Sequence, residues 1–399
     1  MEEKRSIPLL VLLLLGVIIG IVIGLYANNT IMSILQSIKY ILGQIILFMI
    51  PLVIVAFITP AVAKMRSHAS KMLGTMLFLA YSSSVGAALF AMICGYSIIP
   101  SLHITSTAQS LQKLPEMLFT LNIPPLFSVM SALVFSLFFG VAIAWTQSEL
   151  LEKITDEFND VVLVLVQRII IPILPFFIMT TFAILTFEGK ITKQLPIFIQ
   201  VILLVIVGHL LWLTLLYTIA GIVSKKNPLQ LIKHYGPVYF TAVGTMSSAA
   251  TLPVALTQVR KANIIHPEIT NFAIPLGATV HLCGSVLTET FFIMAVSQIL
   301  TGALPTVGTM ILFIFLLGIF AIGAPGVPGG TLMASLGLIS AVIGFDDTGI
   351  ALMLTIFALQ DSFGTACNLT GDGALALIMD GIFKKELSSK PHGSEVCSA

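Results

Sequence analysis

Long apolar runs dominate the first half of the chain. The run at 7–27 has the roughly 20 residues that a helix needs to cross a bilayer. It is too long for the apolar region of a signal peptide, so we interpret it as a membrane span. Because lipid satisfies no backbone hydrogen bonds, and the alternating segments of a β-barrel are absent, this run and its successors are predicted to be helices. The successors are 37–62, 73–98, 121–146, 159–186 and 195–223.

The apolar segments of the second half are interrupted. Segment 241–259 has small and hydroxyl residues at its centre, and segment 320–339 contains five glycines and two prolines. Gly and Pro interrupt helices, and non-helical backbone at membrane depth persists only against protein or a water-filled cavity. Two such segments indicate a pair of re-entrant hairpins around a transporter binding site.

A polar patch lies in segment 268–301, between Gly277 and Gly284. An unwound helix here would expose carbonyls to a cation, whereas a continuous helix would pack its small face on a neighbour. The residues alone leave both alternatives open. The polar side chains of the patch are Thr279, His281, Cys283 and Ser285.

Composition places this chain of 399 residues in a membrane. Hydrophobic residues make up 57% and charged residues 9%, and the mean hydropathy is +1.06. These values exclude a disordered chain and disfavour a soluble enzyme. The net charge of +1 provides no basic field for nucleic acid. The four cysteines lie far apart and form neither a disulfide framework nor a zinc motif.

The basic residues predict the orientation. With the N-terminus inside, 14 of the 19 Lys and Arg residues fall in cytoplasmic segments and 4 outside, with Arg168 in or near the fifth span. The positive-inside rule therefore favours a multi-pass protein of the cell membrane, with both termini in the cytoplasm.

The last apolar segment, 348–383, contains the clearest candidate site. Asp361, Thr365, Asn368 and Asp372 are spaced by 4, 3 and 4 residues, which places them on one face of a helix. Carboxylates inside a membrane segment are expensive and usually functional. This stripe suits an ammonium group, a carboxylate group and a small cation, since charge-assisted hydrogen bonds are about twice as strong as neutral ones.

Four stretches in this order resemble the dicarboxylate/amino acid:cation symporter family, which has the glutamate-transporter fold: SSAATLPV, IPLGATVHLCGS, GAPGVPGG and DSFGTACNLTGD. The resemblance covers essentially the whole chain. It implies an all-α membrane protein with eight transmembrane helices, two re-entrant hairpins, inverted repeats and an elevator mechanism, assembled as a homotrimer.

The resemblance also implies a division into two domains. A scaffold for trimerisation would comprise 1–72 and 118–190. A mobile transport domain would comprise 73–100 and 195–385, with hairpins at about 236–262 and 303–342. The tail at 386–399 is predicted to be disordered.

Site residues follow from the same resemblance. The tip of the first hairpin and the last helix would bind an amino acid, and the second hairpin would close over it. The substrate residues would be Ser247, Ser248, Ser285, Val327, Gly329, Asp361, Thr365 and Asn368. Sodium would be bound by Gly277, Thr279, His281, Asn368 and Asp372.

Two departures from the family pattern narrow the substrate. Where members for acidic substrates have an arginine, this chain has Gly364 in the last helix and Met246 in the first hairpin. A buried substrate carboxylate without a partner is strongly disfavoured, and Asp361 would repel a dicarboxylate. A small neutral amino acid such as serine, threonine or alanine fits best. Cystine or a C4-dicarboxylate is the alternative.

The third departure concerns the coupling ions. An Asn–Met–Asp triplet of many sodium-coupled members reads His281-Leu282-Cys283 here. Thiol and imidazole are poor sodium ligands, so we expect fewer sodium ions or a proton in place of one. A neutral His281 that is hydrogen-bonded only to backbone is an alternative of at least equal weight.

Two other functional classes compete with a symporter. An aspartyl protease needs carboxylates about 3 Å apart, whereas Asp361 and Asp372 would lie about 16 Å apart along one helix. We therefore expect no enzyme. A passive channel for amino acids or anions remains open, and uphill uptake distinguishes it from a symporter.

Overall fold

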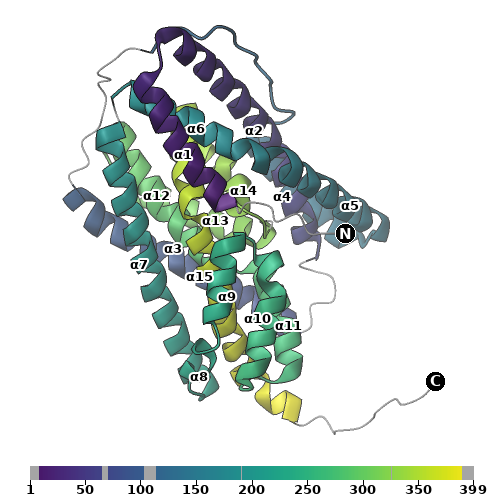
Figure 1. The fold of residues 1–399 in the computed structure, drawn as a ribbon. Helices are drawn as coiled ribbons and strands as arrows, with labels where there is room; N and C mark the ends of the chain where they lie inside the picture. The colour runs from purple at the N-terminus through teal and green to yellow at the C-terminus, as the bar shows by residue number, and fades with distance from the viewer. Residues whose placement is uncertain (1–8, 65–70, 103–113, 190, 325, 389–399) are drawn as a thin grey trace, which may run out of the picture.

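The computed structural model describes residues 9–64, 71–102, 114–189, 191–324 and 326–388, and within them every regular element is helical. Figure 1 shows a helical protein in which α15 runs through the middle. The first half contains α1 (Leu9–Tyr26), α2 (Asn29–Lys64), α3 (Lys71–Ile98) with η1 (Ile99–Leu102), α4 (Val129–Thr146), α5 (Glu149–Leu165), η2 (Val166–Ile170), α6 (Ile171–Phe187) and α7 (Ile191–Ser224).

The second half forms two hairpins and two long helical segments. It contains α8 (Leu229–Ile232), α9 (Gly236–Thr245), α10 (Ser248–Ala262), α11 (Pro267–Val280), α12 (Cys283–Thr301), α13 (Val307–Gly323), α14 (Gly330–Leu338), η3 (Ile339–Ile343) and α15 (Asp347–Ser388). By length and composition, six helical segments in the described residues are able to cross a membrane. The predicted disordered tail begins too early, because α15 continues to Ser388; residues 389–399 lie outside the described part.

Three predicted spans begin at clearly different residues in the structure. The span predicted at 37–62 starts already at Asn29. The span predicted at 121–146 starts only at Val129, because Pro124 and Pro125 disfavour helix and the Ser128 side chain caps the first turn. The span predicted at 159–186 starts already at Glu149, which follows the cap Ser148. Its first turns carry charges on one face, so hydropathy alone does not detect them.

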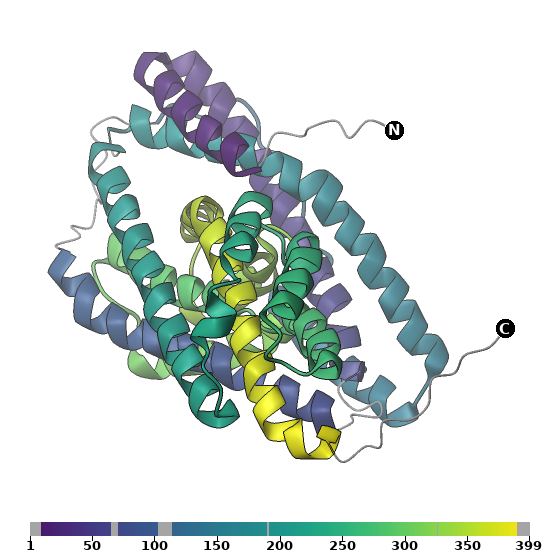
Figure 2. The ribbon, with the colours of Figure 1, turned by 60° about the horizontal axis from the view of Figure 1, so that its bottom comes forward.

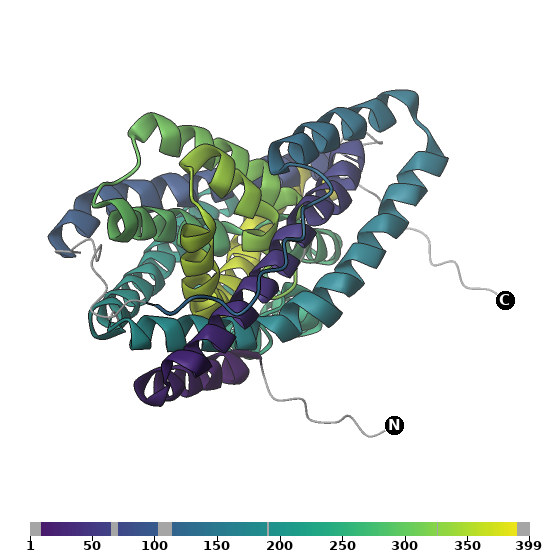
Figure 3. The same cartoon turned by 90° about the horizontal axis from the view of Figure 1, so that it is seen from above.

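Helix contacts separate two groups. In one, α1 packs on α6, and α2 packs on α4, α5 and α6. In the other, α12 packs on α3 and α15, and α15 also contacts α7, α9 and α11. Seen from above, purple α2 and teal α5 and α6 frame one side, while green α12 to α14 lie on the other (Figure 3). We call the first set (α1, α2, α4, α5 and α6) the scaffold and the second set (α3, α7 and α9 to α15) the transport group. The division into two domains and the trimer stay predictions.

The lower end of the transport group is tied together by polar contacts. Lys226, which follows α7, donates hydrogen bonds to the Asp380 carboxylate and to the carbonyl oxygen of Ile264. The other oxygen of Asp380 accepts the His266 backbone N–H at 2.7 Å. These contacts hold the connection between α10 and α11 against α15, beside the end of α7 (Figure 2).

Candidate functional site

The polar stripe of α15 lies inside the protein. Asp361, Thr365, Asn368 and Asp372 are all buried, the last of them completely. They lie on one uninterrupted helix, so the sharp break that a carboxylate dyad requires is absent from α15. Their partners come from α11, α12 and the second hairpin.

Asp361 faces the tip of the second hairpin. Its Oδ2 accepts the backbone N–H of Gly329 at 2.6 Å. Gly329 caps α14 with φ +71°, a conformation that favours glycine. The carboxylate predicted to bind the substrate ammonium is therefore engaged by the hairpin backbone in this conformation. An amino acid has to displace this N–H to reach Oδ2.

The two hairpin tips contact each other. The Ser247 hydroxyl donates to the carbonyl oxygen of Gly326 at 2.9 Å and accepts the N–H of Ala250. Ser248, at the first position of α10, is buried. A Cβ added at Gly326 would lie 3.6 Å from the Cβ of Ser248, so the two tips are in close contact here as well. Since the first N–H groups of a helix have no intrahelical acceptor, the start of α10 favours an anionic group.

Asn368 is fully engaged by α12. Its Oδ1 accepts the N–H groups of Gly284 at 2.7 Å and Ser285 at 3.1 Å, and its Nδ2 donates to the Ser285 hydroxyl at 2.9 Å. A Cβ on Gly364 would lie 3.4 Å from that same hydroxyl. The side chain predicted to hold a substrate carboxylate thus caps a helix here, and the prediction stays untested.

The segment with the polar patch is interrupted. α11 ends at Val280 and α12 begins at Cys283, with extended or irregular backbone at His281 and Leu282. At this break His281 Nδ1 lies 2.9 Å from Asp372 Oδ1, and its Nε2 lies 2.9 Å from the Ser83 hydroxyl on α3. The unwound alternative is therefore the one that the structure adopts.

The predicted sodium residues fall into two places. Gly277 approaches Asp372 so closely that a Cβ would lie 2.8 Å from Oδ1, and its carbonyl accepts the His281 N–H. Asp372 Oδ2 is buried and has no hydrogen-bond partner. An unpaired buried carboxylate oxygen fits a hard cation such as sodium. Thr279 is exposed and donates to the Leu276 carbonyl, so it lies apart from Asp372.

Thr279 lines a cavity between the scaffold and the transport group. This cavity of about 580 Å³ also reaches Gly326 and Val327 at the second hairpin tip, and its opposite wall comes from α2 and α5. It leads from the hairpin tips toward the predicted cytoplasmic ends of α2 and α3. The cavity therefore lies between the scaffold and the transport group and borders both hairpin tips.

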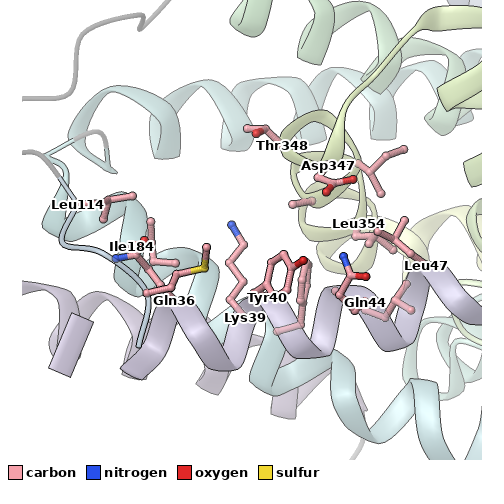
Figure 4. A pocket seen from close by; sticks show the side chains of 16 residues that line it. Gln36, Lys39, Tyr40, Gln44, Leu47, Leu114, Ile184, Asp347, Thr348 and Leu354 are labelled. Atoms are coloured by element: carbon pink, nitrogen blue, oxygen red, sulfur yellow. The ribbon is translucent and has the colours of Figure 1, made fainter. Parts of the chain in front are cut away.

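A second cavity of about 230 Å³ lies at the predicted outer side. Lys39 of α2 and Asp347 of α15 reach toward this space from opposite walls, as Figure 4 shows. Its floor is apolar and includes Phe177 and Leu354. None of the predicted substrate or sodium residues lines this cavity.

Comparisons with known proteins agree with this architecture. Residues 9–382 match the sequence profile of the sodium:dicarboxylate symporter family. Excitatory amino acid transporter 3 of Bos taurus is 29% identical over 273 residues, which make up 67% of this chain and 51% of the relative. Neutral amino acid transporter B(0) of Mus musculus is 31% identical over 254 residues, which make up 61% and 44%. The chain spans about half the length of these relatives.

Proposed function

The chain belongs to the sodium:dicarboxylate symporter family, a family of transporters and not of enzymes, and from this premise we propose that it couples uptake of a small neutral amino acid to sodium. The observation that carries the proposal is the buried stripe of α15, in which Asp361 faces a hairpin tip and position 364 has no side chain. Relatives include transporters for excitatory and for neutral amino acids.

Asp361 and the start of α10 supply the two complementary charges. The Asp361 carboxylate binds the α-ammonium group after Gly329 has moved away, and the N-terminal N–H groups of α10 bind the α-carboxylate. Bonds between ionised groups are the strong ones in such a site. Because Gly329 N–H and the ammonium use the same oxygen, amino acid binding and the position of the second hairpin are linked.

The two arginines in the described part of the chain form their contacts away from the stripe, which favours a substrate with a neutral side chain. Arg260 donates to the Asn271 side chain, and Arg168 is exposed on η2 in the scaffold. Neither is positioned at Gly364 or Met246. A substrate carboxylate at this depth would lack a cationic partner, which is strongly disfavoured.

Sodium would be held at Asp372 with carbonyls of Gly277 and Asn368, and its gradient supplies the energy for uptake. Since His281 already bonds Asp372 Oδ1, the pair leaves one carboxylate oxygen for the ion. Replacement of one sodium by a proton is part of this proposal. The transporter is expected to act in the cell membrane as a homotrimer, with both termini in the cytoplasm.

Uptake by purified protein in sealed proteoliposomes tests this function. With an inward sodium gradient, serine, threonine or alanine should accumulate above its external concentration, whereas glutamate, aspartate, succinate and cystine should not. Equilibration without accumulation would favour the channel alternative. Accumulation of succinate or cystine alone would favour the alternative substrates.

Substitution of Gly364 tests the basis of the specificity. Gly364→Arg should weaken neutral amino acid uptake at least tenfold and introduce aspartate uptake, because a hydrogen bond to a charged group contributes about 1.5–3 kcal/mol. Gly364→Ala is the matched control, since its Cβ meets Ser285 only at ordinary contact distance. Radiolabelled uptake of both substrates measures the change. A Gly364→Arg variant that still excludes aspartate would contradict the proposed pocket.

A further inference from the structure

Two buried polar atoms lack partners near the same point of α15. One is Asp372 Oδ2; the other is the hydroxyl of Tyr235, whose side chain is 2% exposed. Neither atom bonds to the other, although both belong to a well-packed region. Buried polar groups in folded proteins nearly always have a partner, and an ion or a water is the usual one where the protein offers none.

Gly373 brings the tyrosine hydroxyls to this point. A Cβ on Gly373 would lie 2.5 Å from the Tyr235 hydroxyl and 2.7 Å from that of Tyr217 on α7. Tyr217 donates to the carbonyl oxygen of Thr370 at 2.9 Å, and Gly373 directly follows Asp372 in the chain. Oxygen atoms from α7, from the residue before α9 and from α15 therefore gather at Gly373, the residue after Asp372.

A cavity adjoins this group of oxygens. It has a volume of about 360 Å³ and is lined by Tyr217, Tyr235, Tyr239 and Thr370 among others. It shares no lining residue with the cavity at the hairpin tips. This volume is large enough for several water molecules. The two helices beside this cavity, α7 and α9, both pack on α15.

We propose that Tyr235, supported by Tyr217, is a ligand of the cation bound at Asp372. This inference rests on the proposed sodium coupling. The ion lies between Asp372 Oδ2 and the Tyr235 hydroxyl and keeps water ligands from the tyrosine-lined cavity. Carboxylate, hydroxyl, carbonyl and water oxygens are the ligands that a small hard cation prefers.

Equilibrium binding of ²²Na⁺ to the purified protein tests the proposal. Tyr235→Phe removes one oxygen and keeps the ring, so the half-saturating sodium concentration should rise about tenfold or more. Amino acid affinity at saturating sodium should stay unchanged. Tyr239→Phe is the matched control. Tyr239 lines the same cavity, but its hydroxyl is not among the atoms nearest to a Cβ on Gly373. Its sodium curve should match that of the unaltered protein.

The outcomes separate the two proposals. If the sodium-binding curve of Tyr235→Phe superimposes on that of the unaltered protein, Tyr235 is not a ligand of the ion. A water molecule would then be the partner of Asp372 Oδ2. If the unaltered protein binds no ²²Na⁺, the proposed sodium coupling fails instead. Gly373→Ala provides a second variant, since its methyl group displaces both hydroxyls while leaving them present. It should weaken sodium binding at least as much as Tyr235→Phe, and unchanged binding there also contradicts the proposal.

Discussion

The central helices are surrounded by protein to a much greater extent than the peripheral helices. In the most apolar stretch of α11–α12, 94% of the residues are buried, and in α15 the share is 89%. In α5–α6 and in α7 it is 33%. Of the five buried carboxylates in the described residues, Glu289, Asp361, Asp372 and Asp380 lie on the two central segments, and Glu188 follows the end of α6. Polar groups at membrane depth are thus placed where protein, and not lipid, surrounds them.

Glycines differ between the two regions as well. In the scaffold, a Cβ on Gly16, Gly20 or Gly24 of α1 would lie less than 3 Å from backbone carbonyl oxygens of α6. In the centre, Gly277 and Gly373 approach the Asp372 carboxylate and the tyrosine hydroxyls. Small residues serve close helix packing in the first case and admit functional side chains in the second. Substitutions should separate these two roles.

Asp361→Asn should have the largest effect. It removes the charge that pairs with the substrate ammonium, so amino acid binding should weaken about 10–100-fold, by the 1.5–3 kcal/mol of a hydrogen bond to a charged group. Equilibrium binding of labelled serine at saturating sodium measures the loss. Asp160→Asn, on an exposed position of α5, is the control and should leave binding unchanged. Equal binding by both variants would remove Asp361 from the site.

Gly277→Ala should have an intermediate effect. Its Cβ would lie 2.8 Å from Asp372 Oδ1 and 2.9 Å from Cγ, so the carboxylate must shift away from residue 277, and its hydrogen bond with His281 is disturbed. A misplaced ligand typically weakens metal binding by about tenfold or more, and the half-saturating sodium concentration should rise accordingly. Gly308→Ala on α13 meets nothing within 4 Å and serves as the control. A normal sodium curve for Gly277→Ala would place the ion elsewhere.

The stripe of α15 is the part of the site that the sequence predicts best. Spacing alone places Asp361, Thr365, Asn368 and Asp372 on one face, and the structure buries all four on one helix. Helix periodicity depends only on nearby residues, so the shared face can be predicted from spacing. Acidic residues within a long apolar run are stable only where protein, and not lipid, surrounds them. Gly and Pro at the hairpin tips carry a similar local signal.

Contacts between distant segments were not predictable in the same way. The engagement of Asn368 by the start of α12 and the bond from Gly329 to Asp361 join residues far apart in the chain. The proposed roles of Tyr217 and Tyr235 were not predictable either, because a tyrosine in an apolar segment gives no local sign of its partner. The flanking glycines of Gly371-Asp372-Gly373 were the available signal for a close approach.

Gly20→Ala should have the smallest effect on ligands and mainly change stability. Its Cβ would lie 2.3 Å from the Met179 carbonyl oxygen, and backbone cannot move aside as a side chain does. Such overpacking typically costs about 1–3 kcal/mol, so the thermal midpoint should fall while sodium and amino acid affinities stay normal. Gly43→Ala on α2 is the control, since its Cβ meets only the Phe177 ring at 3.7 Å. A Gly20→Ala variant with normal stability but altered sodium affinity would show that α1 packing is coupled to the central site, and the contrast between the two regions would no longer hold.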